Sequence, residues 1–461
     1  MKIPQSPPGP ERTAARFVAV ASAPDAVEVL SKLATLDDRR YLHWDDLRRR
    51  NPPKGLDHET WWTLLKVKRG SAQRVTPISA TNAKPFTWNA TDPILEQLHN
   101  IDLWAGGLIG LAEPQPGISG AATSIIGNRE TQGVYLMSSL INEAITSSQL
   151  EGASTTRDVA QDMLLSRRAP RDTSERMILN NYQTMQRIGE LKSHELTPEL
   201  VFELHRLVTA DTLDKPDGAG RLRRSDEDIA VVDTDDQVLH QPPAAESLPE
   251  RLDQMCAFAN GKPLGHYMHP AVRAIVLHFW LAYDHPFIDG NGRTARALFY
   301  WAMLRAGYWL FGYVSISEVI LRAPKKYGRA FLLTETDSND LTYFVGYHLE
   351  VIRESLETLK RFIAKKADDV RSLDVILRGA ADRFNHRQRE LLSHALRHPA
   401  QLYTIAGHQA RQGVVYQTAR TDLLGLAEAG LLKKAESGNK LVFRPMPDLE
   451  RKLGALDGSS P

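Results

Sequence analysis

The stretch that decides the fold is residues 285–296, which have the sequence HPFIDGNGRTAR. The segment before it, residues 269–283, has Pro270 near its first turn and apolar residues on all sides, which predicts a buried helix. The segment after it, residues 294–306, predicts a second helix with Gly307 at its C-terminal stop. Two helices joined by a tight loop are therefore expected at the centre of the fold.

The residues of this loop predict an anion site. Residues 290–292, Gly-Asn-Gly, allow backbone amides to approach an anion closely, and the helix that begins there adds the positive end of its dipole. Arg293 and Arg296 are three residues apart, so both point to one side of the first turn. His285 can act as a base near neutral pH, and Asp289 is a hard oxygen ligand suited to Mg²⁺. The loop is thus a candidate phosphate site with a general base and a metal ligand.

The whole stretch resembles the motif of the Fic family, His-x-Phe-x-(Asp/Glu)-Gly-Asn-Gly-Arg-x-x-Arg, and every fixed position is matched. Most Fic proteins transfer AMP from ATP to a Ser, Thr or Tyr hydroxyl of a protein and release pyrophosphate. The resemblance implies an all-α, Fic-type helical bundle with a small β-hairpin flap. It also implies ATP as substrate, Mg²⁺ as cofactor and a protein with an acceptor hydroxyl as partner.

The resemblance assigns a role to each position of the loop. His285 would take the proton from the attacking hydroxyl, and Asp289 would hold a Mg²⁺ ion that bridges the α- and β-phosphates. The backbone of residues 290–292 would form the anion hole, and Arg293 and Arg296 would contact the β- and γ-phosphates. The implied ATP-binding residues are Phe287, Gly290, Asn291, Gly292, Arg293, Arg296 and Tyr327.

Two positions refine this expectation. The kinase-like branch of the family has Lys where this chain has Gly292, so Gly292 favours the orientation of ATP that transfers AMP. Tyr327 lies in a segment that resembles the border of the adenine site. The family often has a second Tyr directly after it, whereas this chain has Gly328, and this departure leaves the adenine contact open.

An amphipathic helix is predicted over residues 134–152. Its end resembles the inhibitory motif of the Fic family, (Ser/Thr)-x-x-x-Glu-(Gly/Asn), with Ser147, Glu151 and Gly152 at the fixed positions. Ser147 and Glu151 are four residues apart and share one face of the helix. The resemblance implies that Glu151 pairs with Arg296 through a bidentate contact, withholds it from the γ-phosphate and keeps the activity low. The alternative is that Glu151 is a solvated residue at a helix end.

A short β-hairpin is predicted where residues 229–232 and 238–240 flank an acidic turn. In Fic proteins a hairpin at this place, the flap, pairs with the target segment by strand addition and places its hydroxyl over the site. The preceding cluster of arginines, residues 221–224, is interpreted as a solvated turn. The residues predicted to dock the target are Ile229, Val231, Val232 and Val238.

Helices predicted over residues 385–397, 403–411 and 415–429, followed by a hairpin with Gly438-Asn439 at its turn, resemble a winged helix-turn-helix. In that arrangement the third helix would lie on DNA and the hairpin would contact phosphates. Such modules also mediate protein contacts and dimerisation, so DNA binding and a homodimer are both left open. The candidate DNA contacts are Gln417, Arg420, Lys433 and Lys434.

The length of 461 residues is enough for two to four domains. The expected division is an N-terminal accessory region at 1–85, a Fic core at 86–366 and a winged-helix domain at 371–450. Residues 1–25 are expected to lack regular structure. The charged residues nearly balance, with a net charge of +1, and there is a single cysteine, Cys256. This composition suits a cytoplasmic protein without a disulfide framework or a membrane segment.

The function expected from the sequence is that of an autoinhibited protein adenylyltransferase that modifies another protein or itself. Three alternatives remain. The same site could remove AMP, with Glu151 activating water, or it could transfer a different phosphate-linked group. The chain could also be a DNA-binding regulator that senses ATP. Loss of AMP from a modified target would favour removal, and a salt-dependent duplex shift abolished by Arg420→Ala would favour the regulator.

Overall fold

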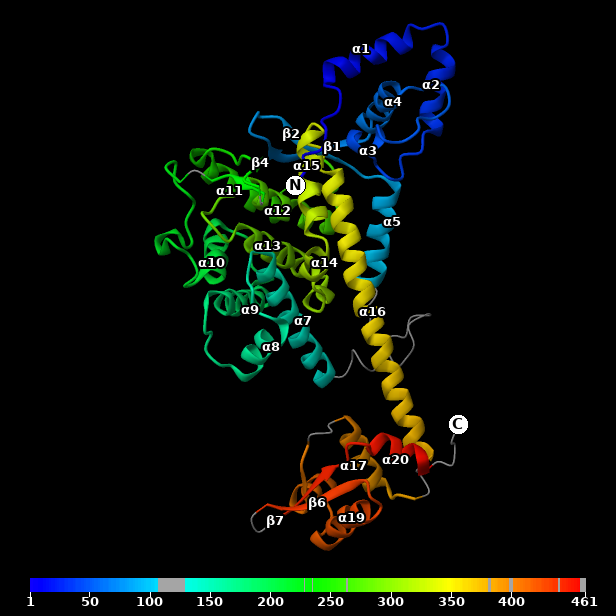
Figure 1. Ribbon diagram of the computed structural model, residues 1–461, viewed down its shortest axis with the longest axis vertical. Helices are drawn as coiled ribbons and strands as arrows, with labels where there is room; N and C mark the ends of the chain where they lie inside the picture. Colours follow the sequence, from blue (N-terminus) through cyan, green and yellow to red (C-terminus); the bar gives the residue numbers. More distant parts are fainter. Residues whose placement is uncertain are drawn as a thin grey trace. The chain divides into compact units, whose positions relative to one another are not determined.

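The computed structural model describes residues 1–106, 129–227, 229–233, 235–262, 264–379, 383–397, 401–437 and 440–456. The described chain is mainly helical with small sheets, which confirms the predicted fold class (Figure 1). It divides into two compact units, the first reaching Leu359 and the second beginning at Lys360.

The first unit contains most of the helices. Its described elements are α1 (Pro10–Ala21), α2 (Ala26–Thr35), α3 (Trp44–Leu47), α4 (His58–Gly70), β1 (Gln73–Ser79), β2 (Pro85–Asn89), α5 (Asp92–Ile101), α7 (Arg129–Leu150), α8 (Arg157–Ser166), α9 (Thr173–Leu191), α10 (Pro198–Thr209), β3 (Val231–Val232), β4 (Val238–His240), α11 (Leu248–Ala259), α12 (Pro270–Asp284), α13 (Asn291–Arg305), α14 (Ile316–Arg322), α15 (Pro324–Thr336) and the start of α16 (Thr342–Gly379).

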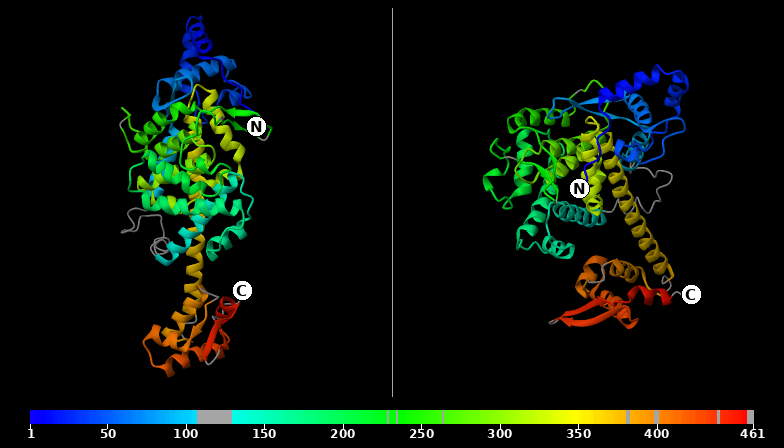
Figure 2. Two further views of the ribbon diagram at one scale, coloured as in Figure 1. Left: turned by 90° about the vertical axis from the view of Figure 1, so that its left-hand side faces the viewer. Right: turned by 45° about the horizontal axis from the view of Figure 1, so that its top comes forward.

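The centre of the first unit is the pair α12 and α13, which pack against each other and are buried along nearly their whole length. The first turn of α12 has Pro270, whose missing N–H would be unpaired there in any case, and the side chain of His269 accepts from the amide of Ala271. Around this pair pack α7, α9, α10 and α11 (Figures 1 and 2). The core therefore fixes the two helices that border the predicted loop.

The helix that carries the predicted inhibitory motif is held by a buried carboxylate. Glu143 of α7 accepts hydrogen bonds from the hydroxyls of Tyr300, at 2.8 Å, and Ser315, at 2.7 Å, and from the backbone and side chain of Ser317. Burial raises the pKa of Glu143, and these donors oppose that rise. The contacts tie α7 to α13 and to the start of α14, so the C-terminal end of α7 is placed relative to the loop.

The N-terminal region differs from the expectation in two ways. Residues 10–21, expected to lack structure, form α1, which packs against α4. Residues 73–79 form β1, which pairs with β2 as an antiparallel hairpin across the boundary expected at residue 85. The periodic signal missed β1 because a proline interrupts the strand and only Val75 and Ile78 are large and apolar.

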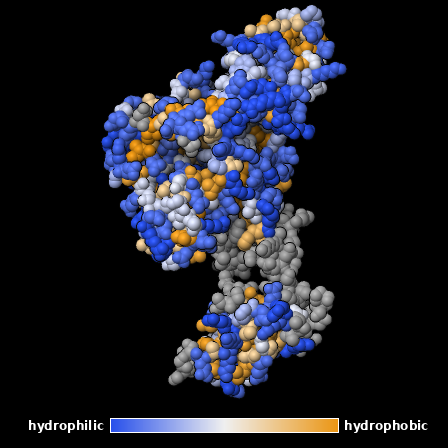
Figure 3. All heavy atoms as spheres, in the orientation of Figure 1, coloured by the Kyte–Doolittle hydropathy of each residue, from blue (hydrophilic) through white to orange (hydrophobic). Residues whose placement is uncertain are grey.

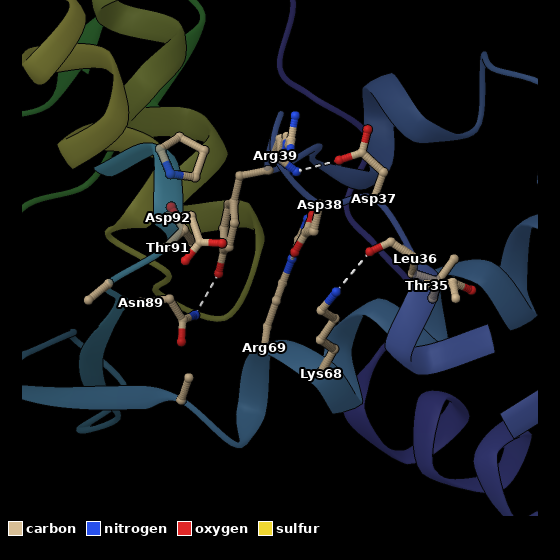
Figure 4. Close-up of a pocket in the computed structure, with 14 residues that line it drawn as sticks. Thr35, Leu36, Asp37, Asp38, Arg39, Lys68, Arg69, Asn89, Thr91 and Asp92 are labelled. Carbon is tan, nitrogen blue, oxygen red and sulfur yellow. Dashed lines mark hydrogen bonds and ion pairs between the residues drawn. The ribbon is translucent and has the colours of Figure 1, made fainter. Parts of the chain in front are cut away.

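A second feature of this region is a polar cavity of about 460 Å³ between the ends of α2 and α4 and the start of α5 (Figure 4). The hydroxyl of Tyr41 donates to Asp340 at 2.6 Å and accepts from the amide of Asn89 at 2.6 Å. Arg69 pairs with Asp38 and lies over the Tyr41 ring at 3.8 Å. This network anchors the N-terminal region to the residues just before α16.

The second unit contains the remainder of α16, then α17 (His386–Arg397), β5 (Tyr403–Thr404), α18 (Ile405–Gln412), α19 (Tyr416–Glu428), β6 (Leu432–Ser437), β7 (Lys440–Pro445) and α20 (Leu449–Leu456). The sheet is antiparallel with strand order β5-β7-β6. Three helices and a hairpin were expected here, but Tyr403 and Thr404 form a strand rather than the start of a helix. The Thr404 side chain then caps α18 by accepting from the Gly407 amide at 3.1 Å.

The winged-helix assignment and the domain limits remain predictions. The limits expected at residues 366 and 371 both lie within α16. The hairpin turn expected at residues 438–439 lies outside the described residues.

None of the described helices is long and apolar enough to cross a membrane. Figure 3 shows hydrophilic residues over most of one face, with hydrophobic residues scattered among them.

Candidate active site

A cavity of about 1040 Å³ lies where six segments of the first unit meet. They are the N-terminal residues Met1 and Lys2, the end of α7, the β3–β4 hairpin, the end of α12, the start of α13, and α15. Several residues singled out from the sequence line it, namely Glu151, Val231, Val232, His285, Gly292, Arg296 and Tyr327. The fold thus brings together these residues, which are up to 176 positions apart in the chain.

The loop between α12 and α13 is shaped by backbone conformation and by one amide side chain. His285 ends α12 in the left-handed region, at φ 45°, and Gly290 precedes α13 at φ 78°. A Cβ on Gly290 would lie 2.6 Å from Thr209, so only glycine fits there. The Asn291 amide accepts from the backbone N–H of Phe287 at 3.0 Å and donates to its carbonyl at 2.8 Å. Asn291 therefore closes the loop through its side chain.

His285 is arranged as a neutral base. Its Nδ1 lies 3.2 Å from the carbonyl oxygen of Ala282. Because a carbonyl only accepts, Nδ1 carries the hydrogen and Nε2 keeps its lone pair. Burial is the main reason that the pKa of His285 is lowered. The imidazole that lines the cavity can therefore accept a proton at neutral pH.

Phe287 and Asp289 both contact a histidine, His205, that the sequence did not assign to the site. The ring of His205, from α10, stacks on Phe287 with centroids 3.7 Å apart. Its Nδ1 accepts from the Gly220 amide at 2.9 Å, so its Nε2 donates to the Asp289 carbonyl, also at 2.9 Å. Burial lowers the pKa of His205 to about 4. A neutral His205 thus supports the loop.

Arg223 is a second residue that the sequence did not single out for the site. It was grouped with a solvated turn, but the structure buries it and its Nε donates to the His285 carbonyl at 3.0 Å. Its guanidinium also donates to the Pro243 carbonyl, after the flap. Arg221 pairs with Glu227 instead, and Arg224 is exposed. Only the tertiary fold distinguishes these arginines, so no local signal could have found Arg223.

Arg296 is buried, and the end of α7 binds two of its three guanidinium nitrogens. Its Nε donates to the Ser147 hydroxyl at 2.8 Å, and its Nη2 donates to the Ser147 carbonyl and to Glu151 Oε1, both at 2.9 Å. The expected contact between Glu151 and Arg296 is present. This contact is not the bidentate pair that was expected, because the guanidinium Nε donates to the Ser147 hydroxyl and not to a second carboxylate oxygen. Gly152 follows at φ 92°, a left-handed conformation suited to glycine.

The carboxylate of Glu151 also lies against the first turn of α13. A Cβ on Gly292 would overlap this carboxylate, so the missing side chain is what admits it. The N-terminus of a helix favours negative charge because its first amides are unpaired and its dipole is positive there. Glu151 therefore occupies the place where the sequence predicted phosphate.

Asp289 and Arg293 of the loop differ in exposure. Asp289 is exposed to solvent, whereas Arg293 is buried. The Asp289 side chain is 58% exposed and accepts from the Gly290 amide at 2.6 Å. Arg293 is buried, donates to the Val208 carbonyl at 3.1 Å and lies 3.5 Å from Asp289. Phe287, Asn291 and Arg293 are thus buried in the loop, whereas Gly292 and Arg296 line the cavity.

Asp289 fits the Mg²⁺ site that the resemblance implies. Across the described part of the chain, no group of three or more His, Cys, Asp or Glu side chains could hold a metal ion. Mg²⁺ commonly uses one or two carboxylates together with phosphate oxygens and water. An exposed single carboxylate beside an anion site is compatible with that use.

Tyr327 lines the cavity from α15, and its hydroxyl lies 2.9 Å from Nε2 of the buried His278. Burial raises the pKa of Tyr327, so its hydroxyl stays protonated. The neighbouring Gly328 packs against Met1, because a Cβ at 328 would lie 2.5 Å from the Met1 side chain. Tyr327 is therefore a fixed wall of the cavity.

The predicted flap is present as β3 and β4, which pair antiparallel through Val231 with His240 and Val232 with Val238. Val232 is 49% exposed and Val238 is 51% exposed. Ile229 precedes the hairpin, and its carbonyl accepts from Gln241 at 3.4 Å.

The candidate DNA contacts all lie on the surface of the second unit. Gln417 and Arg420 are exposed on α19, and Lys433 and Lys434 are exposed on β6.

Comparisons with known proteins show which family this part of the chain resembles. Residues 195–303, which include the loop, match the model of the Fic/DOC family. "Protein adenylyltransferase Fic" of Nematostella vectensis is 30% identical over 173 residues, which are 38% of this chain and 35% of that protein. "Protein adenylyltransferase fic-1" of Caenorhabditis briggsae is 30% identical over 170 residues, 37% of this chain and 29% of that protein. The matched part thus covers 35% or less of the length of these relatives.

A solved Fic family protein from Desulfovibrio desulfuricans G20 superimposes with a TM-score of 0.50 at 17% identity, over 76% of this chain and 96% of that one. At this identity the likeness concerns the fold. The family model covers the two central helices and the loop between them, whereas Glu151 and Tyr327 lie outside the matched residues. Through residues 195–303, this chain carries a domain of the Fic/DOC family.

Proposed function

We propose that the chain is a protein adenylyltransferase, which moves AMP from ATP to a Ser, Thr or Tyr hydroxyl of a protein, itself included. The observation that supports this most is the state of His285. Its Nδ1 is bound to the Ala282 carbonyl, so Nε2 is free to act as a base in a cavity that Gly292 and Arg296 also line. A neutral base beside a helix N-terminus and an arginine is what transfer of a nucleotidyl group requires.

The proposed reaction is one displacement at phosphorus. His285 Nε2 takes the proton of the acceptor hydroxyl, and the hydroxyl oxygen bonds to the α-phosphorus of ATP. The bond from that phosphorus to the oxygen bridging the α- and β-phosphates breaks, and pyrophosphate leaves with the electron pair. The amides at the start of α13 and the guanidinium of Arg296 stabilise the phosphate charge. Asp289 would hold Mg²⁺, which would neutralise further phosphate charge.

We further propose that α7 restrains this reaction. The Glu151 carboxylate contacts Arg296 and lies over Gly292, so it competes with phosphate for the same donors. With Glu151 in place, ATP would bind without the γ-phosphate contact that aligns its α-phosphate. The structure then corresponds to the restrained state, and withdrawal of Glu151 would give the active one.

The proposed acceptor is a segment that adds to the flap as a strand. Val232 and Val238 are half-exposed, and the short β3–β4 hairpin has a free edge among the described residues. Backbone pairing tolerates many side-chain sequences, so it would bring different hydroxyls over His285. A homodimer and a cytoplasmic location are proposed alongside, the latter supported by the lone cysteine, Cys256.

The direct test is incubation of the chain with Mg²⁺ and ATP, followed by mass spectrometry for AMP adducts. The wild-type chain should give few adducts on itself, and the Glu151→Gly chain should give many more. Nucleotide binding without adducts in either chain would refute self-modification, and it would favour AMP removal or regulation. Loss of AMP from a modified protein on incubation would then identify removal.

DNA binding by the second unit is a second candidate function. The observation that favours it is that Gln417 and Arg420 are exposed on α19, while Leu423 and Leu426 of the same helix are buried in the core. We expect the chain to shift a DNA duplex on a gel, with an affinity that falls as salt rises. The Arg420→Ala chain should bind more weakly, whereas Arg451→Ala, which changes an exposed side chain of α20, should not. Equal binding by both variants would show that Arg420 of α19 does not contact the DNA.

A further inference from the structure

His240 is the last residue of β4, and both nitrogens of its ring face oxygen atoms. Its Nδ1 lies 2.7 Å from Oε2 of Glu335, on α15. Its Nε2 lies 2.7 Å from the carbonyl oxygen of Tyr283, on α12. The His240 side chain is 9% exposed, so water does not replace either contact. The β4 end of the flap is therefore joined to the body of the first unit through one imidazole, while Asp233 in the hairpin turn pairs with the amino group of Met1.

The two contacts restrict where protons can be. A backbone carbonyl only accepts, so Nε2 of His240 carries a hydrogen. The contact between Nδ1 and the Glu335 carboxyl needs one more proton, because two lone pairs at 2.7 Å would repel each other. His205 makes a useful contrast, since its Nδ1 accepts from the Gly220 amide and the ring is satisfied as a neutral imidazole. His240 is satisfied with both nitrogens protonated.

The charges around His240 agree with a cationic ring. Glu335 faces it from α15, while α12 presents Tyr283, Asp284 and His285, and Asp284 is itself paired with Arg251 of α11. Burial opposes the charge, but Glu335, the Tyr283 carbonyl and Asp284 outweigh it, so the pKa of His240 is raised. The same positive charge helps to lower the pKa of His285.

The anchor is close in sequence to the proposed base on one side and to the flap on the other. Tyr283 is two residues before His285, and His240 pairs with Val231 across the hairpin. Both His240 and His285 line the cavity. A rigid link at His240 therefore fixes the position of the hairpin relative to the group that accepts the proton.

We propose that His240 is a positioning residue of the AMP transfer: as an imidazolium held between Glu335 and the Tyr283 carbonyl, it locks the flap beside His285 so that an acceptor hydroxyl meets the base. This inference rests on the proposed function. In this role His240 does not contact the reacting atoms. His240 instead raises the fraction of bound acceptor segments whose hydroxyl lies within reach of Nε2 of His285.

The lock has a pH dependence opposite to that of the base. Because the pKa of His240 is raised, the imidazolium is present below that pKa and is lost as the pH rises through it. His285 must be neutral to act, and because its pKa is lowered, it becomes active as the pH rises through a value below the ordinary one. Activity should therefore have an acid limb set by His285 and an alkaline limb set by His240.

The first experiment is ¹⁵N spectroscopy of the histidine rings in the full wild-type chain, with signals assigned by their loss in His240→Gln and in His205→Gln. At mildly alkaline pH, both nitrogens of His240 should carry hydrogens, whereas His205 should show one protonated and one bare nitrogen. In Glu335→Gln, His240 should become neutral at that pH. A neutral His240 ring in the wild-type chain would overturn the proposal.

The second experiment measures self-adduct formation with Mg²⁺ and ATP in the Glu151→Gly background. His240→Gln and Glu335→Gln should each lower the maximal rate about tenfold and leave the half-saturating ATP concentration nearly unchanged, since the loss falls on the acceptor and not on ATP. His58→Gln, at a partly exposed site at the start of α4, serves as the control and should keep the parent rate. Thermal unfolding shows whether each variant is folded.

The pH profile separates positioning from a general loss of structure. The parent chain should lose activity on the alkaline side, and Glu335→Gln should lose it at a lower pH. His240→Gln, which has no ring to titrate, should lack that limb. Identical alkaline limbs in all three would refute the role of His240. If Glu151→Gly forms no adducts, the proposed self-modification fails, and the ring spectra still decide the state of His240.

Discussion

Replacing His285 with alanine in the Glu151→Gly chain is expected to lower the rate of AMP transfer about a thousandfold, the typical contribution of a general base. The ring is held by the Ala282 carbonyl with its Nε2 unprotonated, and no other neutral imidazole with a free nitrogen lines the cavity among the described residues. Without it, the acceptor hydroxyl must lose its proton to water. The rate of adduct formation by mass spectrometry, at saturating ATP, measures this loss.

ATP binding provides the control for this substitution. Gly292 and Arg296 remain in place in His285→Ala, so the affinity for ATP, measured by calorimetry with Mg²⁺, should change little. His99→Ala, which removes an exposed imidazole on α5, should retain the parent rate. If the His285→Ala chain transfers AMP as fast as its parent, another group is the base and the proposed mechanism is wrong.

Replacing Glu151 with glycine should raise the rate of transfer by about 10- to 100-fold. Hydrogen bonds to charged groups contribute about 1.5–3 kcal/mol, and each 1.4 kcal/mol corresponds to a tenfold change. The carboxylate now holds Arg296 at 2.9 Å and covers Gly292. Its removal would free both donors for phosphate. Initial rates of adduct formation would measure the gain in transfer rate, and the dissociation constant for ATP would measure any gain in ATP binding.

Two further variants separate charge from shape. Glu151→Gln keeps the size of the side chain but removes its charge, so it should release the activity only in part. Gln149→Ala changes the same end of α7 without touching Arg296, and its rate should match the wild type. The fold should survive Glu151→Gly because Ser147 still accepts from Arg296. Equal rates in wild type and Glu151→Gly, with activity still dependent on His285, would contradict the restraint.

The loop, its two helices and the flap hairpin could be predicted because their signals are local. Gly290 is required by a left-handed backbone, and Pro270 marks a helix start. The direction in which each side chain points was harder to predict from the sequence. The backbone of Asn291 was expected in the anion hole, and the structure adds that its side-chain amide bonds to Phe287, while Arg293 is buried against the Val208 carbonyl. A motif names the chemistry of a loop, whereas packing decides which side chains face its cavity.

The residues that the sequence did not reveal depend on partners far away in the chain. Arg223 is separated from the arginines beside it only by its burial and by its contact with the His285 carbonyl, 62 residues on. His240 lies 95 residues from Glu335. Helix α1 was missed because its sequence has few large apolar residues, and it is stabilised by packing against α4. Such pairings have no periodic signal in the sequence.

The glycine at position 292 has a consequence for how regulation and catalysis can vary. Its lack of a side chain makes room for the Glu151 carboxylate and also for a phosphate at the same helix end. Under the proposed function, a side chain at position 292 would therefore displace the Glu151 carboxylate and crowd the phosphate at the same time. A substitution that relieves the restraint and keeps AMP transfer would then be expected at Ser147 or Glu151 rather than at position 292.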